Sequence, residues 1–134
     1  MTNLEIVKQK LYEKNASLVV LYSNGECKEY YQNRINDIKD ILRENKLALK
    51  DAVIADKVIG KVAGSILTVA GVKEIYADVM SKYAIPVLEK NNIKYGYKTL
   101  TEYVINNDKT GMCPMENKYK DEKDITKIYN EMIK

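Results

Sequence analysis

The chain has 134 residues, and its 22 lysines and arginines against 19 aspartates and glutamates give a net charge of +3. This length suits a single domain, residues 1–134, and leaves no room for a second. The basic residues are interspersed with acidic ones, which does not indicate nucleic acid as a partner. Because the sequence contains no histidine, acid–base chemistry would fall to Asp, Glu, Lys, Tyr or Cys.

The cysteine content and the N-terminus bear on location. Cys27 and Cys113 are the two cysteines, and without a secretion signal they suggest reduced thiols rather than a disulfide framework. Residues 1–15 are amphipathic and charged throughout, unlike a signal peptide, and no apolar run is long enough to span a bilayer. We therefore expect a cytoplasmic protein that does not associate with membranes.

The first third of the chain predicts a helix, a hairpin and a second helix. Leu4, Val7 and Leu11 recur at helical spacing. Asn24-Gly25 between two apolar runs is a strong hairpin signal. The predicted elements are a helix over Leu4–Lys14, strands over Ser17–Tyr22 and Glu26–Tyr31, and a helix over Arg34–Asn45.

The most apolar stretch, Ala52–Gly71, predicts a buried strand that runs directly into a buried helix. Residues 52–55 are apolar without alternation, as in a strand covered on both faces. Asp56 is a favoured N-cap residue, so the helix is expected to begin there, and Gly71 is expected to terminate it.

The remaining chain alternates strands and helices. This order predicts an α/β protein, a three-layer sandwich whose mixed five-stranded sheet has helices on both faces and parallel later strands. Ligands in such sheets bind at the carboxyl ends of the strands. The predicted elements are strands over Lys73–Val79 and Ile93–Tyr97, a helix over Tyr83–Lys90 with Pro86 in its first turn, a short strand or loop over Glu102–Asn106, and a final helix over Asp124–Ile133.

The turn after the central strand holds the first candidate site, formed by Asp56, Lys57, Gly60 and Lys61. In the predicted helix, Lys57 lies in the first turn, where the helix dipole disfavours a cation, and Lys61 follows one turn later. A bound anion would explain both positions, because free N–H groups and two ammonium groups would converge on it. The alternative is that Asp56 pairs with a lysine at the surface and the Lys61 side chain extends to solvent.

The second candidate site is the segment Thr110–Glu116. Cys113 before Pro114, with Glu116 three residues after the cysteine, is typical of a helix start. A thiol at a helix N-terminus is more reactive, so Cys113 is a candidate nucleophile and Glu116 a candidate general base, with Thr110 and Gly111 as ligand-binding residues. The alternative is a surface turn with a small buried thiol.

Residues 52–64 (AVIADKVIGKVAG), 71–81 (GVKEIYADVMS) and 105–116 (INNDKTGMCPME) resemble a family of small prokaryotic proteins described as a domain of unknown function. The resemblance extends from the Asn24-Gly25 hairpin to about Glu116. It implies the cytidine-deaminase-like fold, with a five-stranded sheet in the order 2-1-3-4-5 between helices.

Active deaminases of that fold hold zinc with His/Cys-x-Glu on one helix and Pro-Cys-x-x-Cys at the start of the next. This chain has neither, and Asp56-Lys57-Val58-Ile59 stands where the second motif is expected. We therefore expect no metal and no other cofactor. The predicted function is binding of a small anionic metabolite, for example a nucleotide-like one, with turnover left open. A non-catalytic sensor or interaction module, with the C-terminal helix forming a homodimer, is the alternative, and a metal-dependent deaminase is favoured least.

Overall fold

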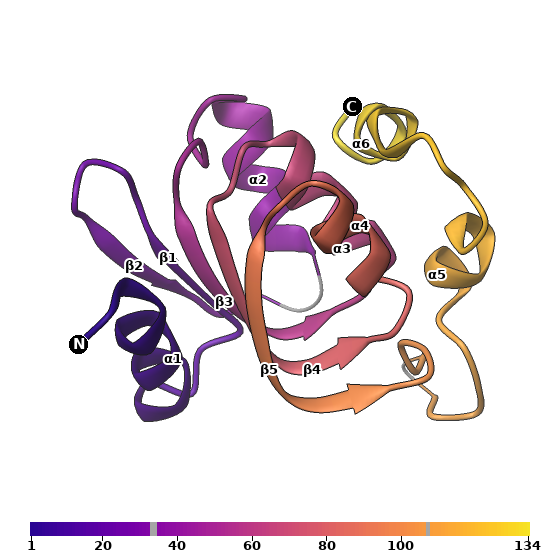
Figure 1. Ribbon diagram of the computed structural model, residues 1–134, viewed down its shortest axis with the longest axis horizontal. Coiled ribbons are helices and arrows are strands. Elements are labelled where there is room, and N and C mark those ends of the chain that lie inside the picture. Colours follow the sequence, from indigo (N-terminus) through magenta and orange to yellow (C-terminus); the bar gives the residue numbers. More distant parts are fainter. Residues whose placement is uncertain (33–34, 107) are drawn as a thin grey trace.

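The structure is a computed structural model that describes residues 1–32, 35–106 and 108–134. Helices and strands alternate along the chain, and a mixed sheet lies at the centre of the molecule (Figure 1). The elements are α1 (Asn3–Glu13), β1 (Leu18–Leu21), β2 (Cys27–Tyr30), α2 (Asn36–Glu44), β3 (Val53–Ile59), α3 (Lys61–Val69), β4 (Glu74–Ser81), α4 (Ile85–Lys90), β5 (Lys94–Thr101), α5 (Pro114–Tyr119) and α6 (Ile125–Met132).

The sheet has five strands in the order β2-β1-β3-β4-β5, which confirms the predicted order. β1 pairs antiparallel with both β2 and β3, whereas β3, β4 and β5 run parallel. The chain therefore changes direction between β1 and β3. The carboxyl ends of β3, β4 and β5 meet at one edge, where ligands bind in open α/β sheets.

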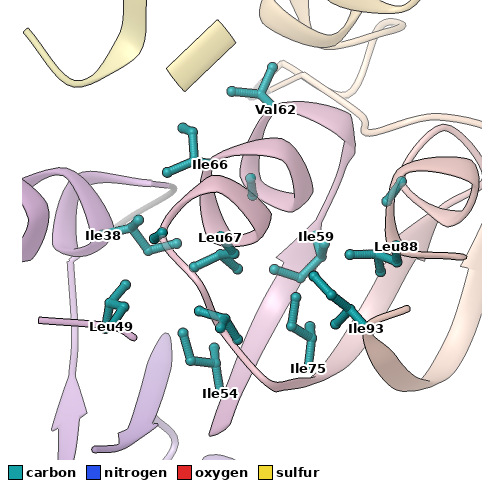
Figure 2. Close-up of a cluster of buried hydrophobic side chains, with 14 of the residues drawn as sticks. Ile38, Leu49, Ile54, Ile59, Val62, Ile66, Leu67, Ile75, Leu88 and Ile93 are labelled. Atoms are coloured by element: carbon teal, nitrogen blue, oxygen red, sulfur yellow. The ribbon is translucent and has the colours of Figure 1, made fainter. Parts of the chain in front are cut away.

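Two apolar clusters occupy the two faces of the sheet. On one face, α1 contributes Val7 and Leu11, which pack with Val19, Val53 and Tyr76. The larger cluster lies on the other face, where α2, α3 and α4 cover the strands and α6 packs against α3. Figure 2 shows Leu67 of α3 above the strand side chains Ile54 and Ile75 and beside Ile59, all fully buried. The prediction of helices on both faces is thus confirmed.

Local signals in the sequence account for the N-terminal elements. Thr2 and Glu5 form a reciprocal capping box at the start of α1. Gly25 adopts a positive φ of 93° in the turn between β1 and β2, the conformation that favours glycine. The predicted hairpin is confirmed, with Leu21 opposite Cys27. The predicted start of the second helix at Arg34 lies outside the described residues, and α2 extends from Asn36 to Glu44.

The predicted boundary between the central strand and helix is wrong. Residues 56–59 continue β3, where Asp56 pairs with Ala77 and Ile59 with Met80 of β4. The N-cap of α3 is Gly60 rather than Asp56. The predicted end is confirmed: Gly71 has a φ of 88°, and N–H groups of Gly71 and Val72 donate to the carbonyl oxygens of Thr68 and Leu67, as in a Schellman motif.

Later elements follow the prediction with longer strands. β4 ends at Ser81 and β5 at Thr101, past the predicted ends at Val79 and Tyr97. Pro86 lies in the first turn of α4, as predicted. Residues 102–106 are a loop, apart from an isolated bridge between Ile105 and Met112. Within the described residues, none of the helices is both long and apolar enough to cross a membrane.

Candidate functional site

A pocket of about 560 Å³ opens at the carboxyl edge of the parallel strands. Its volume lies in the range of small-molecule sites. Val79 near the end of β4 and Thr101 at the end of β5 form part of its wall, and the loop after β5 contributes Tyr103 and Val104. The remaining lining residues are Ser17, Ile35, Asp56, Lys57, Val58, Gly60, Val62, Ala63, Ile105, Cys113, Met115 and Glu116.

Asp56 is one of two acidic side chains in the lining. Only 6% of its surface is exposed. Burial raises the pKa of Asp56 from 3.8 to about 8; nearby Asp37 acts in the same direction, and the backbone amides of Val58 and Lys57 lower it. A carboxyl group with this pKa is largely protonated at neutral pH, unlike an ordinary aspartate.

Glu116 is the second acidic side chain in the pocket lining, and its hydrogen bonds connect three separate parts of the chain. Its Oε1 accepts hydrogen bonds from Lys61 N–H (2.7 Å) and from the Ser81 hydroxyl (3.1 Å). Its Oε2 accepts one from Val104 N–H. Lys61 is the first residue of α3, so this carboxyl group performs the capping role that Gly60, without a side chain, does not.

Gly60 makes the approach of Glu116 possible. A Cβ atom at position 60 would lie 2.5 Å from Glu116 Oε1 and 2.5 Å from Val104 Cγ2. Both distances are far below van der Waals contact, so any side chain here would displace the carboxyl group from the helix end. The predicted ligand-binding residue Gly60 thus lies at the pocket and has a structural role there.

Lys57 and Lys61 do not converge as predicted. Lys57 is an exposed residue of β3, and its Nζ lies 3.4 Å from Asn15 Oδ1. Lys61 begins α3, and its Nζ donates to the Lys120 carbonyl oxygen (2.9 Å) rather than into the pocket. Burial lowers the pKa of Lys61. The predicted pair of cations at one helix N-terminus is therefore wrong, because β3 continues through residues 56–59.

The segment Thr110–Glu116 is only partly at the pocket. Cys113 lines it and is the N-cap residue of α5, with Pro114 in the first turn, as predicted. Thr110 and Gly111 are not among the lining residues. They close a turn in which Thr110 N–H donates to Asn106 Oδ1 and Asn106 N–H donates to the Gly111 carbonyl oxygen. Their predicted ligand-binding role gains no support from this position.

In the described chain, no three His, Cys, Asp or Glu side chains lie close enough to hold a metal ion together. Cys27 is in β2, on the far side of β1 and β3 from β4. Burial raises the pKa of its thiol. Cys27 is also absent from the pocket lining, so the two cysteines do not combine into one site.

The sequence analysis missed the apolar part of the pocket. Val79 and Thr101 follow from topology, because the carboxyl ends of adjacent parallel strands share an edge. Tyr103 and Val104 are less predictable, because the conformation of the loop after β5 brings them to the pocket, and Val104 N–H donates to Glu116 there. The apolar character of Tyr103 and Val104 was the signal in the sequence that could have indicated a place in the pocket wall.

The fold and the pocket together define an α/β protein with a small-molecule-sized cavity at the carboxyl edge of a mixed sheet. The chain belongs to the family described as a domain of unknown function (DUF1893), whose sequence pattern matches residues 6–134. The predicted family membership is thereby confirmed.

A solved structure shows the same fold. It is a DUF1893 family protein (TM1506) from Thermotoga maritima, with a TM-score of 0.85 and 24% sequence identity. The similarity covers 98% of this chain and 88% of the other. No curated protein matches the sequence significantly.

Proposed function

We propose that the protein binds a small metabolite in the pocket at the carboxyl edge of β3, β4 and β5. The observation that carries this proposal is the pocket itself, about 560 Å³ in volume and mostly apolar, with the buried carboxyl group of Asp56 in its wall. A mostly apolar cavity with a few polar groups is typical of ligand sites. Its position at the edge where parallel strands end is a further support.

We further propose that the fold is cytidine-deaminase-like and that the protein works without zinc. The sheet order β2-β1-β3-β4-β5 agrees with the order that the sequence resemblance implies. The chain has no histidine and no Pro-Cys-x-x-Cys, which leaves the zinc-ligand pattern of active deaminases incomplete. A cytoplasmic location is proposed from the two free cysteines, Cys27 and Cys113.

The catalytic roles assigned to Cys113 and Glu116 stay predictions. Glu116 accepts three hydrogen bonds from the protein, which supports a structural task and makes it a poor general base, because its oxygen atoms are engaged. Cys113 lines the pocket, where a nucleophile would meet a ligand. Binding without turnover, as in a sensor, therefore has as much support as catalysis.

A ligand screen by thermal denaturation tests the proposed function. A metabolite at about a hundred times its dissociation constant should stabilise the protein by about 2.7 kcal/mol. Val58→Trp should abolish the effect, because Val58 lines the pocket and is 42% exposed, so a large ring there can block the pocket without entering the core.

Leu47→Trp is the matched control, since Leu47 is 74% exposed and lies outside the pocket. It should keep the response of the wild type. A metabolite that stabilises Val58→Trp and Leu47→Trp equally would contradict binding at this pocket. Zinc belongs in the same screen, and a stoichiometric, tightly bound zinc ion in the purified protein would contradict the zinc-free proposal.

A further inference from the structure

Among the described residues, the support for the Asp56 carboxyl group comes from the nearby backbone amides of Val58 and Lys57. Val58 N–H donates to Asp56 Oδ1 across 3.4 Å, which is long for a hydrogen bond. In the described part of the chain, no ion pair includes Asp56. A buried polar group with weak partners lowers the stability of a protein. Such a group in a pocket wall is a candidate for ligand recognition.

Glu116 shows by contrast what a structural carboxyl group looks like in this pocket. Its two oxygen atoms accept from Lys61 N–H, the Ser81 hydroxyl and Val104 N–H. These donors occupy it whether or not a ligand is present. Of the two carboxyl groups in the pocket, Asp56 is therefore the one that keeps hydrogen-bonding capacity for a ligand.

Within the described residues, no ion pair would compensate the negative charge that Asp56 acquires when its carboxyl group ionises. Asp37 of α2 and Glu116 of α5 are acidic. Lys57 is exposed and contacts Asn15, and the Lys61 ammonium donates to Lys120. Burial raises the pKa of Asp56 to about 8, and the Asp37 carboxylate acts in the same direction. Among the residues that the structure describes, none forms an ion pair with Asp56, so a ligand with a positive charge suits this position.

We propose that the ligand of this pocket carries an amine, which binds as an ammonium group to the Asp56 carboxylate while its small apolar body contacts Val62, Val79 and Val104. This inference rests on the proposed function and names its ligand class. A metal cation fits less well, because three ligands do not gather here. A neutral hydroxyl group would gain no ion pair, and a carboxylate ligand would meet two acidic side chains.

Proton balance distinguishes the ammonium from other ligands. Below pH 8 the Asp56 carboxyl is protonated in the free protein. An ammonium ligand binds the ionised form, so the carboxyl proton leaves to solvent, and about one proton is released per ligand bound. The apparent affinity should therefore rise about tenfold for each pH unit between pH 6 and 7 and level off near pH 8.

Three ligands of equal size but different charge test the inference. Benzylamine, benzyl alcohol and benzoate share one ring and differ in the group that would face Asp56. In titrations followed by amide NMR signals, benzylamine should bind at least about tenfold more tightly than the other two, as expected for a charge-assisted contact. The affinity for benzylamine should rise with pH as described above, whereas the affinity for benzyl alcohol should not rise with pH.

Asp56→Asn should remove the preference for benzylamine and its pH dependence. Asp51→Asn is the matched control, because Asp51 is exposed, lies outside the pocket and has a φ of 60° that asparagine tolerates. Benzoate binding as tightly as benzylamine, or a flat pH profile in the wild type, would overturn the inference. If Val58→Trp still abolished the binding of screened metabolites, the proposed binding site would stand and only the proposed ligand class would be wrong.

Discussion

Asp56 shows how strongly the surroundings of one side chain decide its chemistry. Its sequence context, an apolar strand followed by Lys57, suggests a helix cap at the surface. In the structure the same side chain is a buried strand residue beside Asp37, and burial raises its pKa to about 8. The sequence could not reveal this, because Asp37 is on α2 and the pocket wall also comes from α3, β4, β5, the loop after β5 and α5.

Replacing Asp56 by Asn should stabilise the protein, and more so at higher pH. Because the folded-state pKa of Asp56 is raised from 3.8 to about 8, the folded state binds more protons than the unfolded state between these pH values. The contribution of Asp56 to stability is therefore complete at acidic pH and lost as the pH rises through about 8. Asparagine keeps the shape and does not titrate.

The difference in unfolding free energy between Asp56→Asn and the wild type should grow by up to about 1.4 kcal/mol for each pH unit between pH 5 and 8. Urea denaturation of both proteins at several pH values measures it. Other titrating groups act nearly equally in the two proteins and cancel. A difference that stays constant with pH would mean that Asp56 ionises alike in the folded and unfolded states.

At the scale of elements, the sheet order and most helices were predictable, and the junction of β3 and α3 was not. Periodicity, the Asn24-Gly25 turn and Gly71 are local signals, and the structure follows them. At residues 56–59 a local signal, Asp as an N-cap, competes with pairing to β4, and pairing prevails. The actual cap of α3 is the Glu116 side chain, which lies 55 residues from Lys61 in the sequence. A local sequence pattern could not predict it.

This long-range cap predicts that Gly60→Ala destabilises the protein. The new Cβ would lie 2.5 Å from both Glu116 Oε1 and Val104 Cγ2, so the carboxyl group or the loop must move. Overpacking of this kind costs about 1–3 kcal/mol. Gly111→Ala is the control, since a Cβ there meets nothing within 4 Å, and its effect should stay within about 0.5 kcal/mol.

Chemical denaturation of both glycine variants measures the two effects. The backbone conformation of Gly60, with φ at −107°, suits alanine, so a loss of stability would report the contact with Glu116 rather than backbone strain. Equal stabilities of Gly60→Ala and Gly111→Ala would show that the cap is not needed to hold α3.

At the scale of the whole molecule, the C-terminal arm, residues 113–134, contacts the rest of the chain through hydrogen bonds and through the main apolar core. Glu116 caps α3, the Lys61 ammonium binds the Lys120 carbonyl oxygen, and α6 buries Ile128 in the main core. Both α5 and α6 contact α3, on the side of the molecule that carries the C-terminus (Figure 1). These contacts place the apolar side of α6 on its own chain, so a homodimer through this helix, predicted as one alternative, would have to use other residues.

If the arm and the sheet form one domain, as predicted for residues 1–134, damage to the arm must lower the stability of the whole chain. Ile128 is fully buried, so Ile128→Ala should destabilise the protein by about 2–5 kcal/mol through lost burial and a cavity. Leu47→Ala, at a side chain that is 74% exposed, should change stability by less than about 0.5 kcal/mol.

Native-state hydrogen exchange of the wild type and Ile128→Ala tests whether the sheet and the C-terminal arm lose stability together. In a single cooperative unit, the slowest amides of β3 and β4 exchange through global unfolding, and their free energy of opening should fall by the same amount as the stability measured with urea. If only α5 and α6 exchanged faster while β3 and β4 kept their protection, the arm would unfold separately. The pocket would then lose Cys113, Met115 and Glu116 without unfolding of the sheet.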